Sequence, residues 1–351
     1  MNQWKKQGVL VLILSMLMVG PYSGWIASMG TAHAAGPFVY GDGSTENPYQ
    51  IATADQFYEI RNYPSSYFVL NEDIDLSTSS ASSDWVPIPD FTGSLDGRGH
   101  RITNLYIQST GNNVGLFAKV GTALSNGIVH NLEVHASQVQ GIDNVGILAG
   151  TNFGSIENVS VTGAVYGQER TGGLIGFNNQ IVNRQHRLFN SHADVYVSGV
   201  KNVGGLIGDS SRGDIINSSA SGVVTGQGDH VGGLIGQNGS SVTQGSHATS
   251  QVHGVHKVGG LVGRSFTSDY LDSSAAGQVH GEDNVGGLIG IIEGTDHRTI
   301  SQSSATGDVN GKENVGGLIG YGLNSAITDS SASGDVTGQG DYVGGLLGNF
   351  S

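Results

Sequence analysis

The sequence predicts an all-β protein: a parallel β-helix, or β-solenoid, of about nine coils of about 28 residues with a short N-terminal capping segment. Two observations support this prediction. A glycine-rich word, most often written VGGLIG, returns along most of the chain, and a second word rich in small residues follows it. Neither word has the 3.6-residue apolar period of a helix.

The first word sets the length of the repeat. Its opening residue is valine in eight copies and threonine in one, and the steps between copies range from 26 to 32 residues. The opening positions are Val114, Val145, Thr171, Val203, Val231, Val258, Val285, Val315 and Val343. Repetition at such a period is typical of solenoids, in which each repeat forms one turn and stacks on its neighbours.

The second word indicates what each turn is made of. It reads INSSASGVVTG from Ile216 and ITDSSASGDVTG from Ile327. Short β-branched stretches interrupted by Gly, Asn and Asp are typical of strands and turns. We therefore expect about three strands in each coil, with successive coils ~4.8 Å apart and equivalent residues stacked in columns.

The paired glycines of the first word are interpreted as structural residues. They include Gly204, Gly205, Gly232, Gly233, Gly286, Gly287, Gly316 and Gly317. Corners require positive φ, and closely packed layers leave no room for a Cβ atom. Strict alternation from Val203 would point Leu206 outward, although that position is aliphatic in every copy. Either a bend at the glycine pair resets the register, or a loop covers the leucine column.

Residues 1–34 have the features of a signal peptide. Lys5 and Lys6 form a basic start, an apolar stretch covers residues 8–20, and residues 32–34 read AHA, a small-residue cleavage signature. The apolar stretch is short for a membrane span, so we expect export and a mature chain that begins at Ala35, without a transmembrane span. An uncleaved N-terminal anchor is the alternative interpretation.

Residues 35–110 are expected to form the N-terminal cap and the first coils. Thr53 and Gln56 have the spacing of a capping box at the start of a short helix. Phe57 and Ile60 give this helix an apolar face, with which it could close the end of the core, as terminal caps of solenoids must.

The two words together resemble the GLUG repeat of bacterial exported surface proteins, between about Val114 and Gly348. Residues 111–351 are thus expected to be GLUG-type β-helix repeats. The preceding segment also resembles the one found before such repeats. The resemblance implies a right-handed parallel β-helix at or beyond the cell surface, in an adhesin-like, surface-layer-associated or peptidase-accessory protein. It supplies no catalytic motif. Because no atypical cap follows the last word, we expect the array to be incomplete at its C-terminus.

Composition limits the partners. Without the signal, the chain has 13 basic and 29 acidic residues, a net charge of −16, and no cysteine. Such a charge argues against binding to nucleic acid or anionic lipid. An exported chain without cysteine must obtain its stability from its fold and not from disulfides.

A column of mostly charged residues lies two positions before each opening residue from Val145 onward. Its members are Asp143, Glu169, Lys201, Asp229, His256, Asp283, Glu313 and Asp341. Three successive carboxylates, Asp283, Glu313 and Asp341, could bind Ca²⁺, which prefers clustered oxygen ligands. The alternative is a row of solvated turns. No other cofactor is predicted.

Two further columns have less specific interpretations. Asn131, Asn158, Asn190, Asn217, Asp272, Gln302 and Asp329 precede the small residues of the second word, and stacked amides can bond along a solenoid axis. His253 and His280 would stack in adjacent coils, but a closed zinc site requires more ligands. Aromatic residues are scattered through the repeats, so the sequence shows no ordered platform for sugars.

The sequence therefore predicts a secreted, cell-surface repeat protein that is not an enzyme and serves as an adhesion, interaction or stalk module. Its expected partner is a surface glycan or a protein ligand. One alternative is a polysaccharide-acting enzyme of the β-helix type, which would need a singular site that the repeats do not show. Another is the non-catalytic front end of a larger surface peptidase, since the chain has no HExxH motif of its own.

Overall fold

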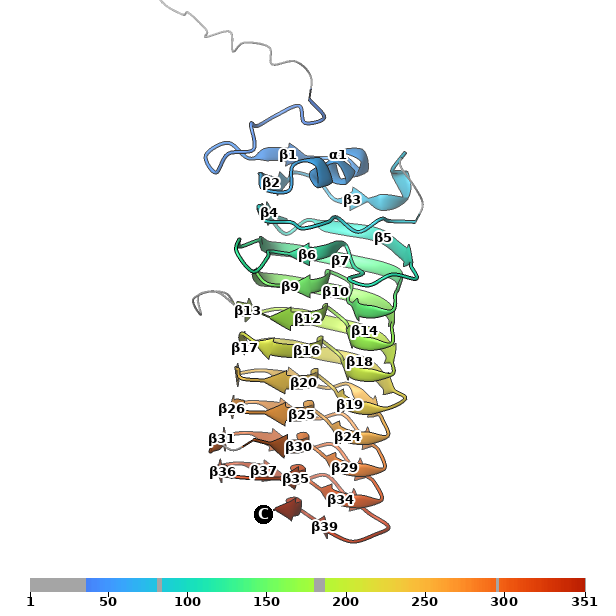
Figure 1. Ribbon diagram of the computed structural model, residues 1–351, viewed down its shortest axis with the longest axis vertical. Helices are drawn as coiled ribbons and strands as arrows, with labels where there is room; N and C mark the ends of the chain where they lie inside the picture. Colours follow the sequence, from blue (N-terminus) through green and yellow to red (C-terminus); the bar gives the residue numbers. More distant parts are fainter. Residues whose placement is uncertain (1–35, 81–83, 180–186, 295–296, 351) are drawn as a thin grey trace, which may run out of the picture. The chain divides into compact units, whose positions relative to one another are not determined.

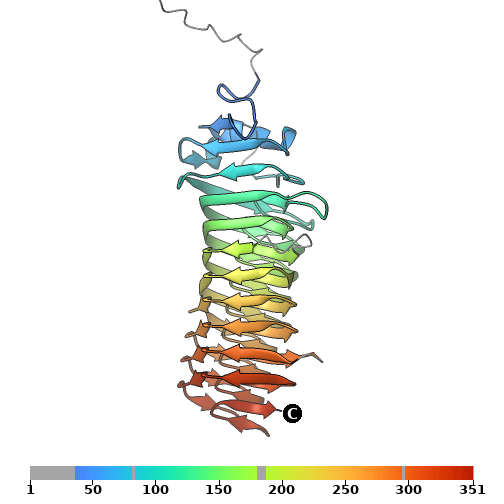
Figure 2. The same cartoon turned by 90° about the vertical axis from the view of Figure 1, so that its left-hand side faces the viewer.

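The computed structural model describes residues 36–80, 84–179, 187–294 and 297–350. Residues 37–351 form one compact unit. In this unit the chain winds into a parallel β-solenoid of about ten turns, whose coils are stacked along one axis (Figures 1 and 2). The predicted all-β solenoid is thus confirmed. The predicted signal peptide lies outside the described residues.

Two of the three sheets contain no more than one strand from each coil. The sheet of eight strands, called sheet 2, contains β8 (Asp143–Val145), β11 (Glu169–Gly172), β15 (Lys201–Gly204), β19 (Asp229–Gly232), β24 (His256–Gly259), β29 (Asp283–Gly286), β34 (Glu313–Gly316) and β39 (Val343–Gly344). The sheet of nine strands, called sheet 3, contains β6 (Phe117–Val120), β9 (Ala149–Asn152), β12 (Ile175–Asn179), β16 (Ile207–Arg212), β20 (Ile235–Gly239), β25 (Val262–Phe266), β30 (Ile289–Glu293), β35 (Ile319–Gly322) and β40 (Leu347–Phe350).

The third sheet, called sheet 1, has 23 strands because many coils contribute several short ones. It contains β1 (Tyr49–Ile51), β2 (Tyr67–Leu70), β3 (Ile74–Asp75), β4 (Ser94–Asp96), β5 (Arg101–Gln108), β7 (Ile128–Gln140), β10 (Ser155–Tyr166), β13 (Arg187–Phe189), β14 (His192–Gly199), β17 (Asp214–Ile216), β18 (Ser219–Gly226), β21 (Val242–Gln244), β22 (His247–Ala248), β23 (Gln251–His253), β26 (Asp269–Leu271), β27 (Ser274–Ala275), β28 (Val279–His280), β31 (Arg298–Ser301), β32 (Ser304–Ala305), β33 (Val309–Asn310), β36 (Ser325–Thr328), β37 (Ser331–Ala332) and β38 (Val336–Thr337).

The leucine column is buried by a bend and not by a loop. β15 ends at Gly204 and β16 begins at Ile207, so the chain turns at Gly205 and Leu206. Val203, Leu206 and Ile207 are all fully buried in one continuous core. The bend resets the alternation of side chains, and two successive aliphatic residues therefore face the interior.

The paired glycines are required by space and not by φ, which corrects the expectation that corners at these glycines need positive φ. None of the eight predicted structural glycines has positive φ. A Cβ atom on Gly205 would lie 2.1 Å from the carbonyl oxygen of Gly233 in the next coil, and one on Gly204 would lie 2.0 Å from that of Ile207 in its own coil. Real Cβ atoms do not approach backbone this closely, so the tight bend and the close stacking of coils together exclude other residues there.

Positive φ occurs mainly at two columns of residues other than glycine. One directly precedes the opening valines, with φ of 49–65°: Asn113, Asn144, Arg170, Asn202, His230, Lys257, Asn284, Asn314 and Tyr342. The other is the predicted amide column, with φ of 46–55°: Asn131, Asn158, Asn190, Asn217, Asp272, Gln302 and Asp329. Asn and Asp tolerate the left-handed conformation better than most residues, which explains their frequency in both columns.

A ladder of serines holds the coils together on the inner side of sheet 1. Its members are Ser191, Ser218, Ser246, Ser273, Ser303 and Ser330, and the first five are buried. Each backbone N–H from Ser191 to Ser303 donates to the hydroxyl of the next serine at 3.1–3.4 Å. Each hydroxyl donates to the carbonyl oxygen two residues before it at 2.8–3.0 Å. The small residues of the second word therefore satisfy buried backbone groups where the strands are interrupted.

Replacing Ser246 by alanine is expected to lower the free energy of unfolding by about 1–3 kcal/mol. The change leaves the buried N–H of Ser218 without its acceptor, and an unsatisfied buried donor costs about that much. The urea midpoint of the full chain measures the effect. Ser274→Ala, at a half-buried serine on the outer side of sheet 1, is the control and should change stability by less than about 0.5 kcal/mol. Equal losses in both variants would contradict the role of the ladder.

A short helix lies at the N-terminal end of the stack (Figure 1). α1 (Ala54–Glu59) begins after Thr53, whose hydroxyl accepts from the N–H of Gln56 at 3.2 Å. The side chain of Gln56 accepts from the N–H of Ala52, one residue before the position that a capping box predicts. Phe57 and Ile60 are fully buried, which confirms the apolar face. The short 3₁₀ helices η1 (Ile60–Asn62) and η2 (Leu76–Thr78) complete this end.

The described residues contain no helix that is long and apolar enough to cross a membrane.

Candidate functional site

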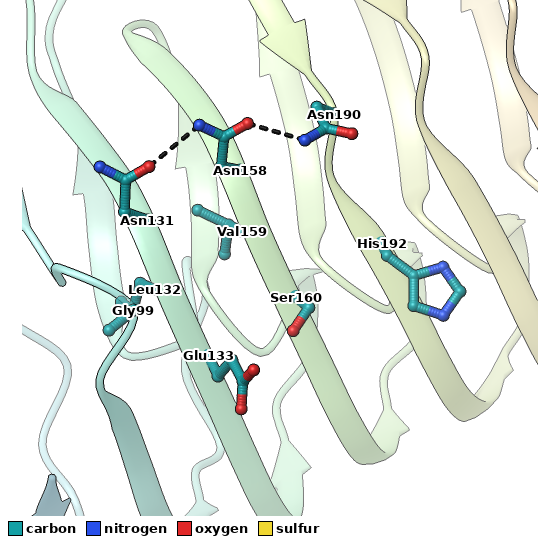
Figure 3. A pocket seen from close by; sticks show the side chains of 9 residues that line it. All are labelled: Gly99, Asn131, Leu132, Glu133, Asn158, Val159, Ser160, Asn190 and His192. Atoms are coloured by element: carbon teal, nitrogen blue, oxygen red, sulfur yellow. Dashed lines mark hydrogen bonds between the residues drawn. The ribbon is translucent and has the colours of Figure 1, made fainter.

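The outer side of sheet 1 presents a row of hydrogen-bonded amides in successive coils. Asn158 donates to Asn131 at 2.9 Å, and Asn190 donates to Asn158 at 2.8 Å (Figure 3). Asn131 in turn donates to the carboxylate of Asp96 at 3.0 Å. The predicted bonding between stacked amides is therefore confirmed for these three residues. Gly245 follows Asn217 in this column, and without a side chain it interrupts the row.

A pocket of about 350 Å³ opens beside these amides, across β7, β10 and the start of β14 (Figure 3). It is lined by Gly99, Asn131, Leu132, Glu133, Asn158, Val159, Ser160, Asn190 and His192. The lining combines amide donors, a carboxylate acceptor, a hydroxyl and an imidazole over a short apolar floor. Such a mixture suits a ligand that both donates and accepts hydrogen bonds.

Glu133, Ser160 and His192 lie in register on neighbouring strands of the pocket. Their bonds do not form the relay of a hydrolytic triad, in which an acid orients the histidine that activates the serine. Nδ1 of His192 lies 2.7 Å from the hydroxyl of Ser219, and Glu133 lies 3.5 Å from Nε2 of His135. The geometry is that of a polar surface along which hydroxyl-rich molecules could bind.

Two exposed tyrosines lie further along the same strands. Tyr166 ends β10 and Tyr196 lies in β14, and their ring centroids are 5.8 Å apart with an interplanar angle of 48°. The two residues are 36% and 40% exposed. The sequence analysis did not find this pair, because the two tyrosines belong to repeats separated by an insertion and are brought together only by strand register.

The predicted calcium column runs along sheet 2. Asp283 is paired in register with Glu313 and with His256, and its carboxylate lies 2.8 Å from Nδ1 of His256. Asp341 is exposed in the bend before β39. Within the described ranges, no three His, Asp or Glu side chains are grouped as a metal site requires. Calcium binding at Asp283, Glu313 and Asp341 stays a prediction. The rings of His253 and His280 lie next to each other in adjacent coils, as expected, with centroids 6.2 Å apart and an interplanar angle of 50°.

A buried polar cluster lies where sheets 2 and 3 meet, and the sequence analysis missed it. The imidazole of His230 donates from Nδ1 to Asn202 at 2.6 Å, and Nζ of Lys257 approaches Nε2 of the same ring at 3.4 Å. Asn202 and Gln237 both donate to Oδ2 of Asp209 at 3.4 Å. Oδ1 of Asp209 has no hydrogen-bond partner among the described residues. The cluster arises because the column before the opening valines faces a column of sheet 3 across the glycine bend.

Burial shifts the pKa values of Asp209 and His230 in opposite directions, because it disfavours the charged form of each group. Desolvation raises the pKa of Asp209 to about 6, although Arg170 opposes the shift. Desolvation, together with Lys257 and Arg264, lowers the pKa of His230 to about 3. His230 is therefore neutral in the folded chain at neutral pH, which agrees with a ring that donates from Nδ1 and accepts at Nε2.

The two groups should contribute opposite pH dependences to stability between about pH 4 and 6. The folded state holds the proton of Asp209 more tightly than the unfolded chain, so this contribution falls by up to about 1.4 kcal/mol per pH unit as the pH rises. For His230 the unfolded chain holds the proton more tightly, so its contribution rises with pH by a similar amount. The difference in unfolding free energy between Asp209→Asn and the unaltered chain should therefore become more favourable to the variant as the pH rises. For His230→Asn the same difference should become less favourable to the variant. Urea unfolding at several pH values measures both, and parallel curves for all three chains would contradict the assignment.

Comparison with known proteins connects the repeats to a described motif. Residues 311–337 match the family model of the GLUG motif. The chain is 40% identical over 164 residues to halomucin of Haloquadratum walsbyi, a match that covers 42% of this chain and 2% of halomucin. It is also 40% identical over 146 residues to a protein of Evansella cellulosilytica assigned as a Gly-rich membrane protein, covering 38% of this chain and 16% of that protein.

A solved structure shares the fold. The crystal structure of a Bacteroides ovatus protein assigned as an immunoglobulin A1 protease superimposes with a TM-score of 0.57, covering 74% of this chain and 80% of that one. The two sequences are 24% identical, so the likeness concerns the fold alone. The chain is a parallel β-solenoid that carries the GLUG motif, matched at residues 311–337.

Proposed function

We propose that the chain is an exported interaction module of the cell surface, which binds a surface glycan or a protein ligand through the outer side of sheet 1. The observation that supports this best is the combination, on neighbouring long strands, of a polar pocket and a pair of exposed tyrosines. Exposed aromatic groups and a polar pocket on one side of a rigid sheet are typical of binding sites. The solenoid fixes the spacing of these groups, because each strand is bonded to the next coil.

The names of the sequence relatives agree with a surface location. One is a halomucin and another is assigned as a Gly-rich membrane protein, although the matched region is a small part of each. The predicted signal peptide gives the same expectation of export. The proposal includes no catalytic step.

Blocking the outer side of sheet 1 should abolish ligand binding. The chain has no cysteine, so a single introduced cysteine can be labelled selectively with a maleimide polyethylene glycol. Thr162 lies in β10 between the pocket and Tyr166, in register with Asp194 of β14. The labelled Thr162→Cys chain should lose binding to arrays of immobilised glycans and extracellular proteins.

Lys312→Cys provides the matched control, because this exposed residue lies many coils away, directly before β34. The labelled Lys312→Cys chain should bind like the unlabelled protein. Absence of any ligand on the arrays, or full binding by the labelled Thr162→Cys chain, would overturn the proposal.

A further inference from the structure

We infer that the ligand of this surface is an uncharged oligosaccharide, which lies along β10 and β14 with one sugar ring against Tyr166 and Tyr196 and another in the pocket. The inference rests on the proposed function and names its ligand class. It follows from the spacing of the two features, from their hydrogen-bonding groups and from the local charge.

The spacing fits an extended chain of sugars. Tyr196 lies four residues beyond His192 in the same strand, and Tyr166 lies six residues beyond Ser160. At ~3.3 Å per residue, the rings lie roughly 13–20 Å from the pocket. His192, Asp194 and Tyr196 alternate with the buried Ala193, Val195 and Val197, so the exposed three share the outer side of the strand. A single sugar cannot reach both features, whereas a short oligosaccharide can.

The tyrosine pair offers an apolar contact for a sugar ring. The two rings are tilted by 48°, so they form a shallow V rather than a flat platform. The C–H face of a pyranose can pack into such a V, as apolar groups pack on aromatic faces elsewhere. A phenol hydroxyl can both donate to and accept from the hydroxyls of a sugar.

The pocket contains both hydrogen-bond donors and hydrogen-bond acceptors, and a hydroxyl group can bond to both. Each amide nitrogen of Asn131, Asn158 and Asn190 has two hydrogens, and the ladder uses one of them. The second hydrogen is available to a ligand at Asn158 and Asn190, whereas Nδ2 of Asn131 also lies 2.9 Å from Nδ1 of His130. Glu133 supplies a carboxylate acceptor, with its side chain 44% exposed, and Ser160 supplies a hydroxyl. A sugar hydroxyl both donates and accepts, so it can bond to neighbouring members of this set at once.

The charge of the surface disfavours acidic sugars. Glu133 is the carboxylate of the pocket lining, and Asp194 lies between the pocket and Tyr196 with an oxygen 2.9 Å from the hydroxyl of Ser221. The chain as a whole is strongly acidic. Arg101 lies 3.9 Å from the carboxylate of Glu133 and offsets part of its charge. The repulsion of a ligand rich in carboxylate or sulfate therefore comes mainly from Asp194 and from the net charge of the chain.

Calorimetric titration of the full chain tests the inference. The probes are cellohexaose, maltohexaose and N-acetylchitohexaose, with a hexamer of galacturonate as the acidic comparison. We expect at least one neutral probe to bind and the acidic probe not to bind. Tyr196→Ala should weaken that binding by about tenfold, the loss of one good aromatic contact, and Tyr196→Phe should keep most of it.

Tyr40→Ala is the matched control, because Tyr40 is also exposed but lies before β1. It should leave the affinity unchanged, and the urea midpoint of Tyr196→Ala should equal that of the unaltered chain. Preferential binding of the acidic probe, or a protein ligand that the label at Thr162 displaces, would overturn the oligosaccharide and leave the interaction module intact. Failure of every probe and of every arrayed ligand would overturn both.

Discussion

Gly232→Ala is expected to destabilise the solenoid by about 4 kcal/mol or more. The added Cβ atom would lie 2.0 Å from the carbonyl oxygen of Ile235 and 2.7 Å from the backbone nitrogen of Gly263 in the next coil. Both atoms belong to the backbone, so no change of rotamer can relieve the contact. Either β19 and β20 must separate at the bend, or the next coil must move away and lose hydrogen bonds to its neighbour.

Urea unfolding of the full chain, followed by circular dichroism, measures this loss. Gly239→Ala is the matched control, because a Cβ atom there would meet its nearest neighbour at 3.7 Å, which is ordinary contact. Gly239 should tolerate alanine within about 0.5 kcal/mol. If both variants unfolded at the same urea concentration, the close backbone contacts within the bend and to the next coil would not be the reason for glycine there.

Leu234→Ala should lower the free energy of unfolding by about 2–5 kcal/mol. Leu234 is fully buried in the core, directly after the glycine pair, and its removal leaves a cavity that neighbouring coils cannot fill. A leucine that faced outward under a covering loop would lose less, because a loop can collapse onto the smaller residue. The size of the loss therefore tests the bend that buries this column.

The matched control for Leu234→Ala is Val200→Ala, at an aliphatic residue that is 41% exposed. Its effect should stay within about 0.5 kcal/mol. Hydrogen exchange adds a local measurement, because loss of packing at Leu234 should increase exchange most in β19, β20 and the strands that adjoin them. An unchanged midpoint for Leu234→Ala would show that the leucine column does not belong to the core.

The stacking of coils could be predicted from the sequence because it depends on one local rule repeated many times. Each opening valine pairs with the next, as Val258 pairs with Val285, so the period of the words is also the register of the strands. The amide row follows for the same reason, since Asn131, Asn158 and Asn190 occupy one position of the second word.

The side chains that break the repeat could not be placed in this way. Tyr166 and Tyr196 meet because β10 and β14 pair in unbroken register over residues 160–166 and 192–198, although an insertion separates β12 from β13. Asp209 occupies a position where neighbouring coils have Phe177 and Gln237, and its environment comes from a different sheet. Contacts between sheets depend on the angle of the bend, which no period in the sequence encodes.

The backbone hydrogen bonds between coils also determine how the solenoid would respond to a mechanical force. They run parallel to the axis of the stack, so tension on its two ends would load one interface between coils at a time. Each coil that peels away would release about 27 residues, as between Val231 and Val258, or roughly 90 Å of extended chain. Under tension the solenoid would therefore unfold coil by coil, and each step would dissipate mechanical work.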